Sequence, residues 1–242
     1  MWRQQSERMR KHSTAQERKE TGRLEALSDG VFGIAMTLLV LLVPIPTSDQ
    51  LTARRTLMDL ALSHWPSFAA YAISFLTILV MWINHHCIFQ YVARIDRVFV
   101  IVNGLLLMLV VFVNYPTALV ANFISFLGTS NGTFAAAMYN ATFVLIAILY
   151  NGMWRRVTYR QRLLASDADP DEVDTITRQY RFGGPLYLVA FGLAFVSPGL
   201  SVALDAALAI FFAFTGQITR SVVDRGAVAP VGQLDASAER PL

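Results

Sequence analysis

The chain has 242 residues and a net charge of +3, and 55% of its residues are hydrophobic while only 15% are charged. A soluble domain usually carries about 25% charged residues, so this composition excludes a protein whose whole surface faces water. Since a membrane-spanning helix needs about 20 apolar residues, six such helices would use about half of the chain, and we predict an all-α membrane protein.

The first predicted element is a polar segment, residues 1–23, which carries seven of the 20 basic residues. An apolar run at 31–43 follows, and a basic segment before a short apolar run can be a signal peptide. The next residues are Pro44-Ile45-Pro46, which offer no cleavage site of small residues. We therefore predict a retained first transmembrane helix that begins near Leu24.

Five further apolar stretches predict five more transmembrane helices. They lie at residues 65–91, 98–127, 134–154, 182–196 and 200–219. The third span is longer than the bilayer requires, so we expect a kink at Pro116 or a protruding end. Asp169 before Pro170 is typical of a helix N-cap and predicts a short helix that leads into the fifth span. The predicted transmembrane domain is 24–219, and the tail 220–242 is predicted to be disordered.

The basic residues predict the orientation of the chain in the membrane. If residues 1–23 are cytoplasmic, then 18 of the 20 basic residues face the cytoplasm, and only Arg54 and Arg55 face outward. Cytoplasmic segments of membrane proteins are enriched in Lys and Arg, and this distribution follows that rule. We therefore predict that both termini are cytoplasmic. The preference for arginine and alanine indicates a bacterial protein, so we expect a multi-pass protein of the cytoplasmic (inner) membrane.

Two common signatures of enzymes and the spacing typical of metal sites are missing from the sequence. It contains no His-Glu-x-x-His and no glycine-rich phosphate loop. Of the four histidines, only His85 and His86 lie near each other, and the Thr-Val-Gly-Tyr-Gly filter of potassium channels is absent as well. We expect no enzyme activity, no cofactor, no bound metal and no nucleic-acid partner; the expected surroundings are the lipid bilayer.

The first predicted helix is the least lipid-like of the six, because Asp29 lies among its apolar residues. A carboxylate is costly inside a membrane, so such a helix belongs inside a bundle or beside water. At 100° per residue, Ile34, Leu38 and Leu41 fall on one narrow stripe, with Thr37 beside it and Asp29 on the far side. The stripe either packs against a neighbouring helix or lines a pore that closes by excluding water.

The second span contains the run Trp-Ile-Asn-His-His, which approaches the cytoplasmic end of that helix. Arg23, Ser28 and Asp29 start the first helix at the same depth, so these groups can form a buried hydrogen-bonded network. Adjacent histidines point about 100° apart, so we expect only one of His85 and His86 to join it. The network either anchors the first helix or transfers protons.

Other polar residues lie within the later spans. Asp205, in the sixth span, is expected at the membrane interface or in a local pair rather than in an ion site. Asn103, Asn114 and Asn122 of the third span are expected to form hydrogen bonds between helices.

The start of the first helix, Arg-Leu-Glu-Ala-Leu-Ser-Asp-Gly-Val-Phe-Gly, resembles the prokaryotic members of the transmembrane protein 175 family of potassium channels. That family has an Arg-x-x-x-Phe-Ser-Asp signature at this place. Arg23, Ser28 and Asp29 match it, and Leu27 replaces the phenylalanine. The Trp-x-Asn-His-His run, the six spans and the chain length are similar as well, and the resemblance covers about residues 20–220.

The resemblance implies a homotetramer in which the first helix of each subunit lines a central pore, with a hydrophobic constriction in place of a carbonyl filter. The constriction positions of the family correspond to Ile34, Leu38 and Leu41, the same stripe that the helical wheel indicates. Thr37 matches a position that the family links to potassium preference. The resemblance therefore implies a potassium-permeable cation channel with modest selectivity for K⁺ over Na⁺, in which the polar network holds the first helix in place.

The main alternative is a proton-coupled secondary transporter that uses Asp29 and a histidine of the second helix as a proton relay. Helices interrupted by glycine or proline in corresponding halves of the chain would favour it, and no convincing pair occurs. A non-conducting membrane scaffold is a third possibility.

Overall fold

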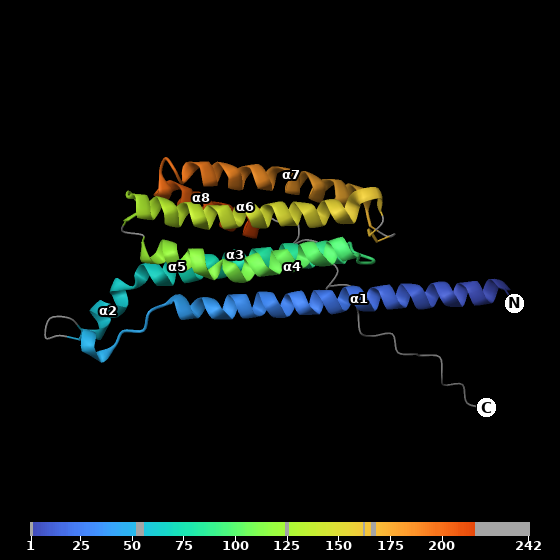
Figure 1. Ribbon diagram of the computed structural model, residues 1–242, viewed down its shortest axis with the longest axis horizontal. Coiled ribbons are helices and arrows are strands. Elements are labelled where there is room, and N and C mark those ends of the chain that lie inside the picture. The colour runs from blue at the N-terminus through green and yellow to red at the C-terminus, as the bar shows by residue number, and fades with distance from the viewer. Residues whose placement is uncertain (1, 52–55, 124–125, 162, 166–167, 216–242) are drawn as a thin grey trace, which may run out of the picture.

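The computed structural model describes residues 2–51, 56–123, 126–161, 163–165 and 168–215, which form the bundle of long helices in Figure 1. The helices are α1 (Trp2–Leu38), α2 (Leu57–Ser63), α3 (Trp65–Gln90), α4 (Arg97–Phe112), α5 (Asn114–Asn122), α6 (Ser130–Thr158), α7 (Pro170–Leu193) and α8 (Pro198–Thr215). Short 3-10 turns occupy Leu39–Leu42, Ser48–Gln50 and Tyr159–Gln161. The described ranges contain no strand beyond an isolated bridge between Val92 and Leu164, which confirms the predicted all-α class.

The first helix is longer than predicted. It begins at Trp2, so the prediction that it begins near Leu24 was wrong. Residues 2–21 contain neither glycine nor proline, and pairs such as Gln16 and Glu20, four residues apart, are hydrogen-bonded along the helix. The 37 residues of α1 extend about 55 Å, beyond the ~30 Å hydrocarbon layer. Figure 1 shows the N-terminal part projecting past the other helices.

The bundle is organised around α6, which contacts α4, α5, α7 and α8. The core joins Phe143 and Trp154 of α6 to Ile78 of α3, to Phe32 of α1 and to Leu39 of the 3-10 turn after α1. In Figure 1, α1 lies along one side of the bundle and α7 along the opposite side, with α3, α4 and α5 between them. Because α1 lies at the edge, one of its faces is left uncovered by its own subunit.

The third predicted span is interrupted near its middle. Pro116 has no amide hydrogen to donate to the carbonyl of Phe112, and α4 ends at that residue while α5 begins two positions later. The expected kink is therefore confirmed. Asn114 and Asn122 were expected to bond between helices, and this was wrong. Their side chains donate to carbonyls of their own span, at 2.9 and 2.8 Å, because the nearest acceptors are the preceding turns.

Four stretches of the described residues are long and apolar enough to cross a membrane. They are Gln16–Leu42, Trp65–Gln90, Arg97–Asn122 and Ser130–Gln161. α8 adds a shorter apolar stretch, Pro198–Ile210. Asp169 caps α7 by accepting a hydrogen bond from the amide of Asp171 at 2.9 Å, as predicted, and the helix then runs without interruption into the fifth predicted span. The predicted tail, 220–242, lies outside the described residues.

An ion pair fastens the loop before α4 to the end of α6. Asp96 caps α4 by accepting a hydrogen bond from the amide of Phe99 at 2.8 Å, and its Oδ2 accepts from the Nε of Arg156 at 2.9 Å. The Arg156 guanidinium holds the pKa of the Asp96 carboxyl below its usual range. The stabilising pair is therefore present at neutral pH and is lost only as the pH falls through that lowered pKa.

Candidate functional site

One face of α1 and of the 3-10 turn that follows it is buried against α3 and α4. It consists of Ser28, Phe32, Ala35 and Leu39, which follow one another at spacings of four, three and four and are each 0% exposed. This spacing keeps all four side chains on one side of an α-helix. The ring of Phe32 also lies 5.2 Å from the ring of His85 on α3. The packing therefore fixes the rotation of α1 about its own axis.

The exposed stripe of α1 consists of Ile34, Leu38 and Leu41, which are 57, 41 and 75% exposed. None of the three belongs to the hydrophobic core that the described residues form. Thr37 lies beside them and is exposed as well, and its hydroxyl donates to the carbonyl of Ile34 at 2.9 Å. The apolar residues that the helical wheel groups together thus face away from the rest of the subunit.

The exposed stripe continues in a straight line beyond the end of α1. The α-helix stops at Leu38 and continues as the 3-10 turn Leu39–Leu42. Residues three apart are eclipsed in a 3-10 helix, so Leu41 lies in line with Leu38. With a rise of about 1.5 Å per residue up to Leu38 and about 2.0 Å beyond it, the stripe is about 12 Å long.

A buried chain of hydrogen bonds joins α3, α4 and α1. Nε2 of His85 lies 2.8 Å from Oδ1 of Asn103, whose Nδ2 donates to the hydroxyl of Ser28 at 3.0 Å. That hydroxyl in turn donates to the carbonyl of Leu24 at 2.9 Å. Since Oδ1 of Asn103 can only accept, Nε2 of His85 carries the hydrogen. The expectation that Asn103 bonds between helices is confirmed, and all three side chains are 0% exposed.

Two further hydrogen bonds join α1 to α3. Nε1 of Trp82 donates to Oδ1 of Asp29 at 2.8 Å, and Nδ1 of His86 lies 3.0 Å from Oε1 of Glu25. Both histidines therefore form interhelical hydrogen bonds, but only the chain that starts at His85 reaches a residue of the predicted network, Ser28. Their rings point in different directions, but α4 lies on one side of α3 and α1 on another, so each ring finds a partner.

Not every residue of the predicted network takes part. The side chain of Arg23 is exposed and forms no hydrogen bond or ion pair with the described residues of its own subunit. Glu25 and Trp82 take part although they were not predicted to. Their spacing in the sequence could have indicated these contacts, because Glu25 precedes Asp29 by four residues and Trp82 precedes His86 by four. When two helices pack antiparallel, two residues one turn apart on the first helix can face two residues one turn apart on the second.

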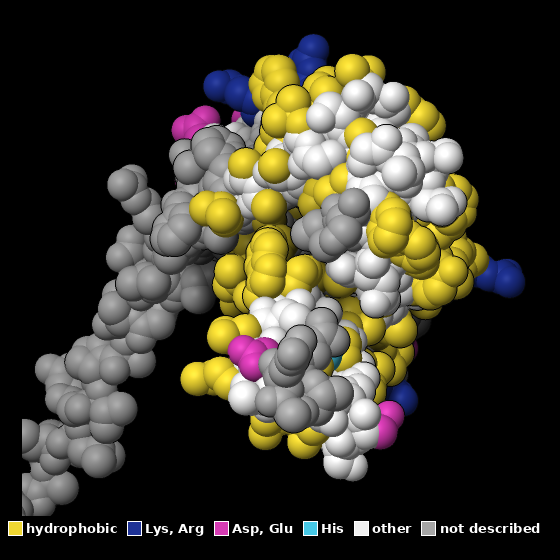
Figure 2. All heavy atoms as spheres, turned by 90° about the vertical axis from the view of Figure 1, so that its left-hand side faces the viewer, with side chains coloured by type: hydrophobic (Ala, Val, Ile, Leu, Met, Phe, Trp, Pro, Cys, Tyr) yellow, Lys and Arg dark blue, Asp and Glu magenta, His cyan; other side chains and the backbone are white. Residues whose placement is uncertain are grey.

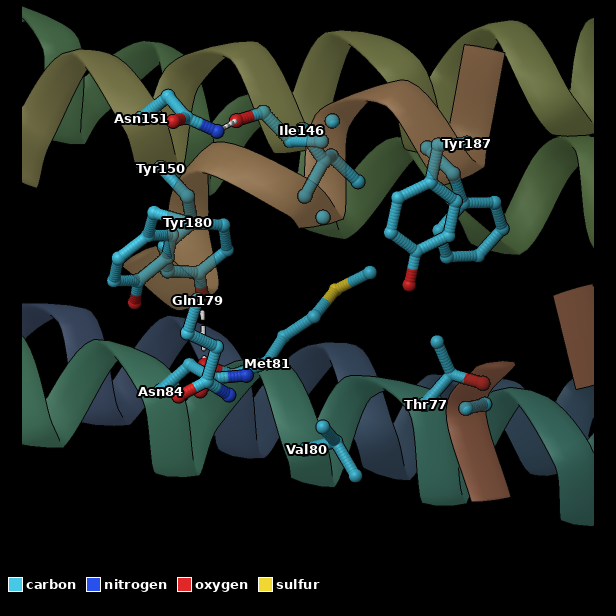
Figure 3. Close-up of a pocket in the computed structure, with 15 residues that line it drawn as sticks. Thr77, Val80, Met81, Asn84, Ile146, Tyr150, Asn151, Gln179, Tyr180 and Tyr187 are labelled. Atoms are coloured by element: carbon cyan, nitrogen blue, oxygen red, sulfur yellow. Dashed lines mark hydrogen bonds between the residues drawn. The ribbon is translucent and has the colours of Figure 1, made fainter. Parts of the chain in front are cut away.

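A cavity of about 80 Å³ lies elsewhere in the subunit, between α3, α6 and α7 (Figure 3). In Figure 3, Met81 and Tyr187 point into it from opposite sides. Tyr150 closes one wall, because its hydroxyl donates to the backbone carbonyl of Met81 at 2.6 Å. No residue of α1 lines this cavity, so it is separate from the exposed stripe.

Asp205 of α8 was expected at the membrane interface or in a local pair, and it forms no local pair with the described residues. Its side chain is buried, and neither carboxyl oxygen has a hydrogen-bond partner among the residues whose structure is described. The reason is the packing of α8 against α3 and α6, which covers this face of the helix.

One enzyme-like sequence occurs, Gly-Thr-Ser-Asn-Gly at residues 128–132. In hydrolases such a motif places its serine on a sharp turn between a strand and a helix. Here Ser130 is exposed and starts α6 after a turn, with no strand before it in the described residues. The motif therefore lacks the structural context of a nucleophile.

The surface of the bundle is apolar. Figure 2 views the end at which α1 stops, and hydrophobic side chains lie along its rim. Side chains such as Phe134, Ile148 and Leu188 are more than half exposed, which is unfavourable in water and favourable in lipid. The fold and the site therefore define a class: a helical membrane protein whose first helix is anchored by polar contacts on one face and presents an apolar stripe on the other.

Comparison with known proteins identifies the family within this class. Residues 23–113 match the family model described as the endosomal/lysosomal potassium channel TMEM175. A potassium channel of Chamaesiphon minutus is 51% identical over 199 residues, which cover 82% of this chain and 96% of that protein. A potassium channel of Streptomyces collinus is 38% identical over 195 residues, or 81% of this chain and 92% of that one. The chain belongs to the TMEM175 family, which is a family of ion channels and not of enzymes.

A solved structure supports the same assignment at the level of the fold. The crystal structure of a lysosomal potassium-selective channel TMEM175 homolog from Chamaesiphon minutus superposes with a TM-score of 0.73 and 47% sequence identity. The match covers 82% of this chain and 99% of the other.

Proposed function

We propose that this protein is a potassium-permeable cation channel. Four identical subunits surround a central pore, and α1 of each subunit lines it. Ile34, Leu38 and Leu41 form the hydrophobic constriction, and Thr37 tunes the preference for K⁺ over Na⁺. Two relatives that align with more than four fifths of this chain are named potassium channels, which supports the choice of ion.

The single observation that carries the proposal is the two-sided packing of α1. Its inner face is fully buried, and four polar side chains on α3 and α4 hold the helix, whereas its apolar stripe is exposed in the described part of the subunit. In a fourfold ring, each position of the stripe becomes a ring of four identical apolar side chains. Such a ring resists ions, because water finds no hydrogen-bond partner in it.

The selectivity that follows from such a constriction is modest. An apolar neck cannot replace the hydration shell of an ion as a ring of carbonyl oxygens does. Ions therefore pass largely hydrated or are briefly stripped of water, and K⁺ loses its water more cheaply than Na⁺. The hydroxyl of Thr37 is the polar group nearest to the stripe, and it already donates to the carbonyl of Ile34. Its oxygen lone pairs remain available to a passing cation.

No observation favours the transporter. A proton relay needs Asp29 next to a histidine, but Asp29 accepts a hydrogen bond from Trp82. His85 and His86 bond to Asn103 and Glu25 instead. These contacts hold helices together, and they do not form a path between Asp29 and either ring.

Purified protein in liposomes with an outward K⁺ gradient provides the test. We expect passive K⁺ efflux without a co-substrate, faster than Na⁺ efflux under the matched gradient. The flux should rise in proportion to the gradient and should not depend on a proton gradient. Saturable exchange of K⁺ for protons would contradict the channel and support the transporter.

We further propose that the chain spans the inner membrane of a bacterium six times, with both termini in the cytoplasm. The distribution of basic residues supports this orientation. Single cysteines test it, because the native Cys87 is buried. In intact cells a membrane-impermeant thiol reagent should label Ser130→Cys, at the start of α6, and should not label Thr175→Cys, near the start of α7. Labelling of Thr175→Cys but not of Ser130→Cys would reverse the orientation.

A further inference from the structure

The outer surface of the bundle carries an open groove between α6 and α7, with a volume of about 480 Å³. Glycines line both walls of the groove, Gly152 on α6 and Gly184 on α7. A Cβ atom added at Gly184 would meet only the side chain of Asn151, at 3.8 Å, so the space there is open. Pro185 of α7 lines the groove as well.

The groove changes from apolar to cationic along its length. Val144 and Ile148 line one end of it on α6 and Leu188 on α7, whereas Arg155 and Arg181 line the other end. From Val144 to Arg155 the wall is eleven residues long, or about 16 Å at 1.5 Å per residue. This is about half of the ~30 Å hydrocarbon core, and so about the depth of one leaflet.

The two arginines at the cationic end have no acidic partner among the described residues. Both are exposed, and neither guanidinium forms an ion pair with a residue in the described part of the chain. Their neighbour Arg156, by contrast, is paired with Asp96. Pro185 also cannot donate to the carbonyl four residues earlier, that of Arg181, which leaves an acceptor at the same end of the groove.

We propose that this groove binds one anionic phospholipid of the leaflet that faces the basic end of the bundle. The phosphate lies between Arg155 and Arg181, and an acyl chain lies along Val144, Ile148 and Leu188. Charge complementarity and the one-leaflet length favour this occupant over a peptide or a soluble ligand. α7 lies on the side of the bundle opposite α1 (Figure 1), so the groove faces lipid when α1 faces the pore. The proposal depends on that placement in the membrane and not on conduction.

Native mass spectrometry of the full chain in detergent, titrated with phosphatidylglycerol or phosphatidylcholine, tests the site. We expect the wild type to bind phosphatidylglycerol more tightly than phosphatidylcholine. The variant Arg155→Gln/Arg181→Gln should bind phosphatidylglycerol about tenfold more weakly, because each basic residue attracts anionic lipid. The matched control Arg160→Gln/Arg178→Gln removes two exposed arginines of the same region outside the groove, and its binding should stay within about twofold of the wild type. The proposal would be overturned if both double variants lost phosphatidylglycerol binding equally. It would also be overturned if Arg155→Gln/Arg181→Gln lost none.

A second variant separates acyl-chain binding from simple anion binding. Gly184→Leu fills the groove and keeps both arginines, so it should also weaken phosphatidylglycerol binding. Excess inorganic phosphate should fail to displace the lipid from the wild type, because phosphate has no acyl chain to occupy the apolar end. Displacement by phosphate, or full binding by Gly184→Leu, would show that the groove is not a phospholipid site. Ion flux is not the readout, so these results are independent of whether the protein conducts.

Discussion

Ile34→Asn is expected to raise the basal K⁺ flux by on the order of tenfold, which corresponds to a barrier lower by about 1.4 kcal/mol. The amide would give water a hydrogen-bond partner in each of the four positions of the ring, so the neck would stay wet. The flux of Na⁺ should increase more than the flux of K⁺, because Na⁺ loses its water less readily and gains more from a wet neck. The preference for K⁺ over Na⁺ should therefore fall. The measurement is K⁺ and Na⁺ efflux from liposomes at matched protein incorporation.

Two further variants show whether the position of the change matters. Leu38→Ala should widen the neck and raise the flux more modestly, because the ring remains apolar. Val40→Asn is the matched control. Val40 is 54% exposed, close to the 57% of Ile34, but in the 3-10 turn it lies about 120° away from the line of Leu38 and Leu41. The K⁺ flux of the Val40→Asn variant should equal that of the wild type.

Leu39 is unsuited as a control, although it also lies off the stripe. It is 0% exposed, and truncating a buried leucine to alanine costs about 2–5 kcal/mol of stability. Any change in flux would then be mixed with unfolding.

If Val40→Asn raises the flux as much as Ile34→Asn does, α1 does not face the pore with its exposed stripe, and the constriction proposed above is wrong.

Asn103→Ala should produce the largest loss of stability among the polar substitutions. Asn103 is the middle of the chain from His85 to Ser28, and without it Nε2–H of His85 loses its acceptor and the hydroxyl of Ser28 loses its donor. A buried polar group left unpaired costs about 1–3 kcal/mol. We expect the thermal midpoint of the purified protein to fall by about 5 °C or more, together with loss of the assembled oligomer. Tryptophan fluorescence and size-exclusion chromatography measure the two effects.

Asn122→Ala is the control for this substitution. Asn122 lies in the same span, but it is exposed and bonds only to the carbonyl of Ala118 on its own helix. Its loss should change the midpoint by no more than about 1–2 °C. A double-mutant cycle of Asn103→Ala with Ser28→Ala should give less than the sum of the single effects, because both remove the same bond. Additive effects, or equal midpoints for Asn103→Ala and Asn122→Ala, would show that the chain of hydrogen bonds does not hold α1.

Features that depend on short stretches of the chain could be predicted from the sequence. A run of apolar residues long enough to cross a bilayer is local, and the first four such runs are the four long apolar helical stretches of the structure. The break beside Pro116 is local as well, since it follows from one missing amide hydrogen. The stripe of Ile34, Leu38 and Leu41 follows from the period of the α-helix, although the 3-10 turn that aligns Leu41 was not expected.

Contacts between helices were decided by the tertiary structure. The run of residues 82–86 indicated a polar network, but the partners of each side chain depend on how α1, α3 and α4 are rotated and shifted against one another. Packing of the buried face of α1 sets that rotation, and it brings Trp82 to Asp29 and His86 to Glu25. The burial of Asp205 and the groove between α6 and α7 have the same origin. Both arise from the packing of helices whose positions are far apart along the chain, and no local pattern of residues specifies that packing.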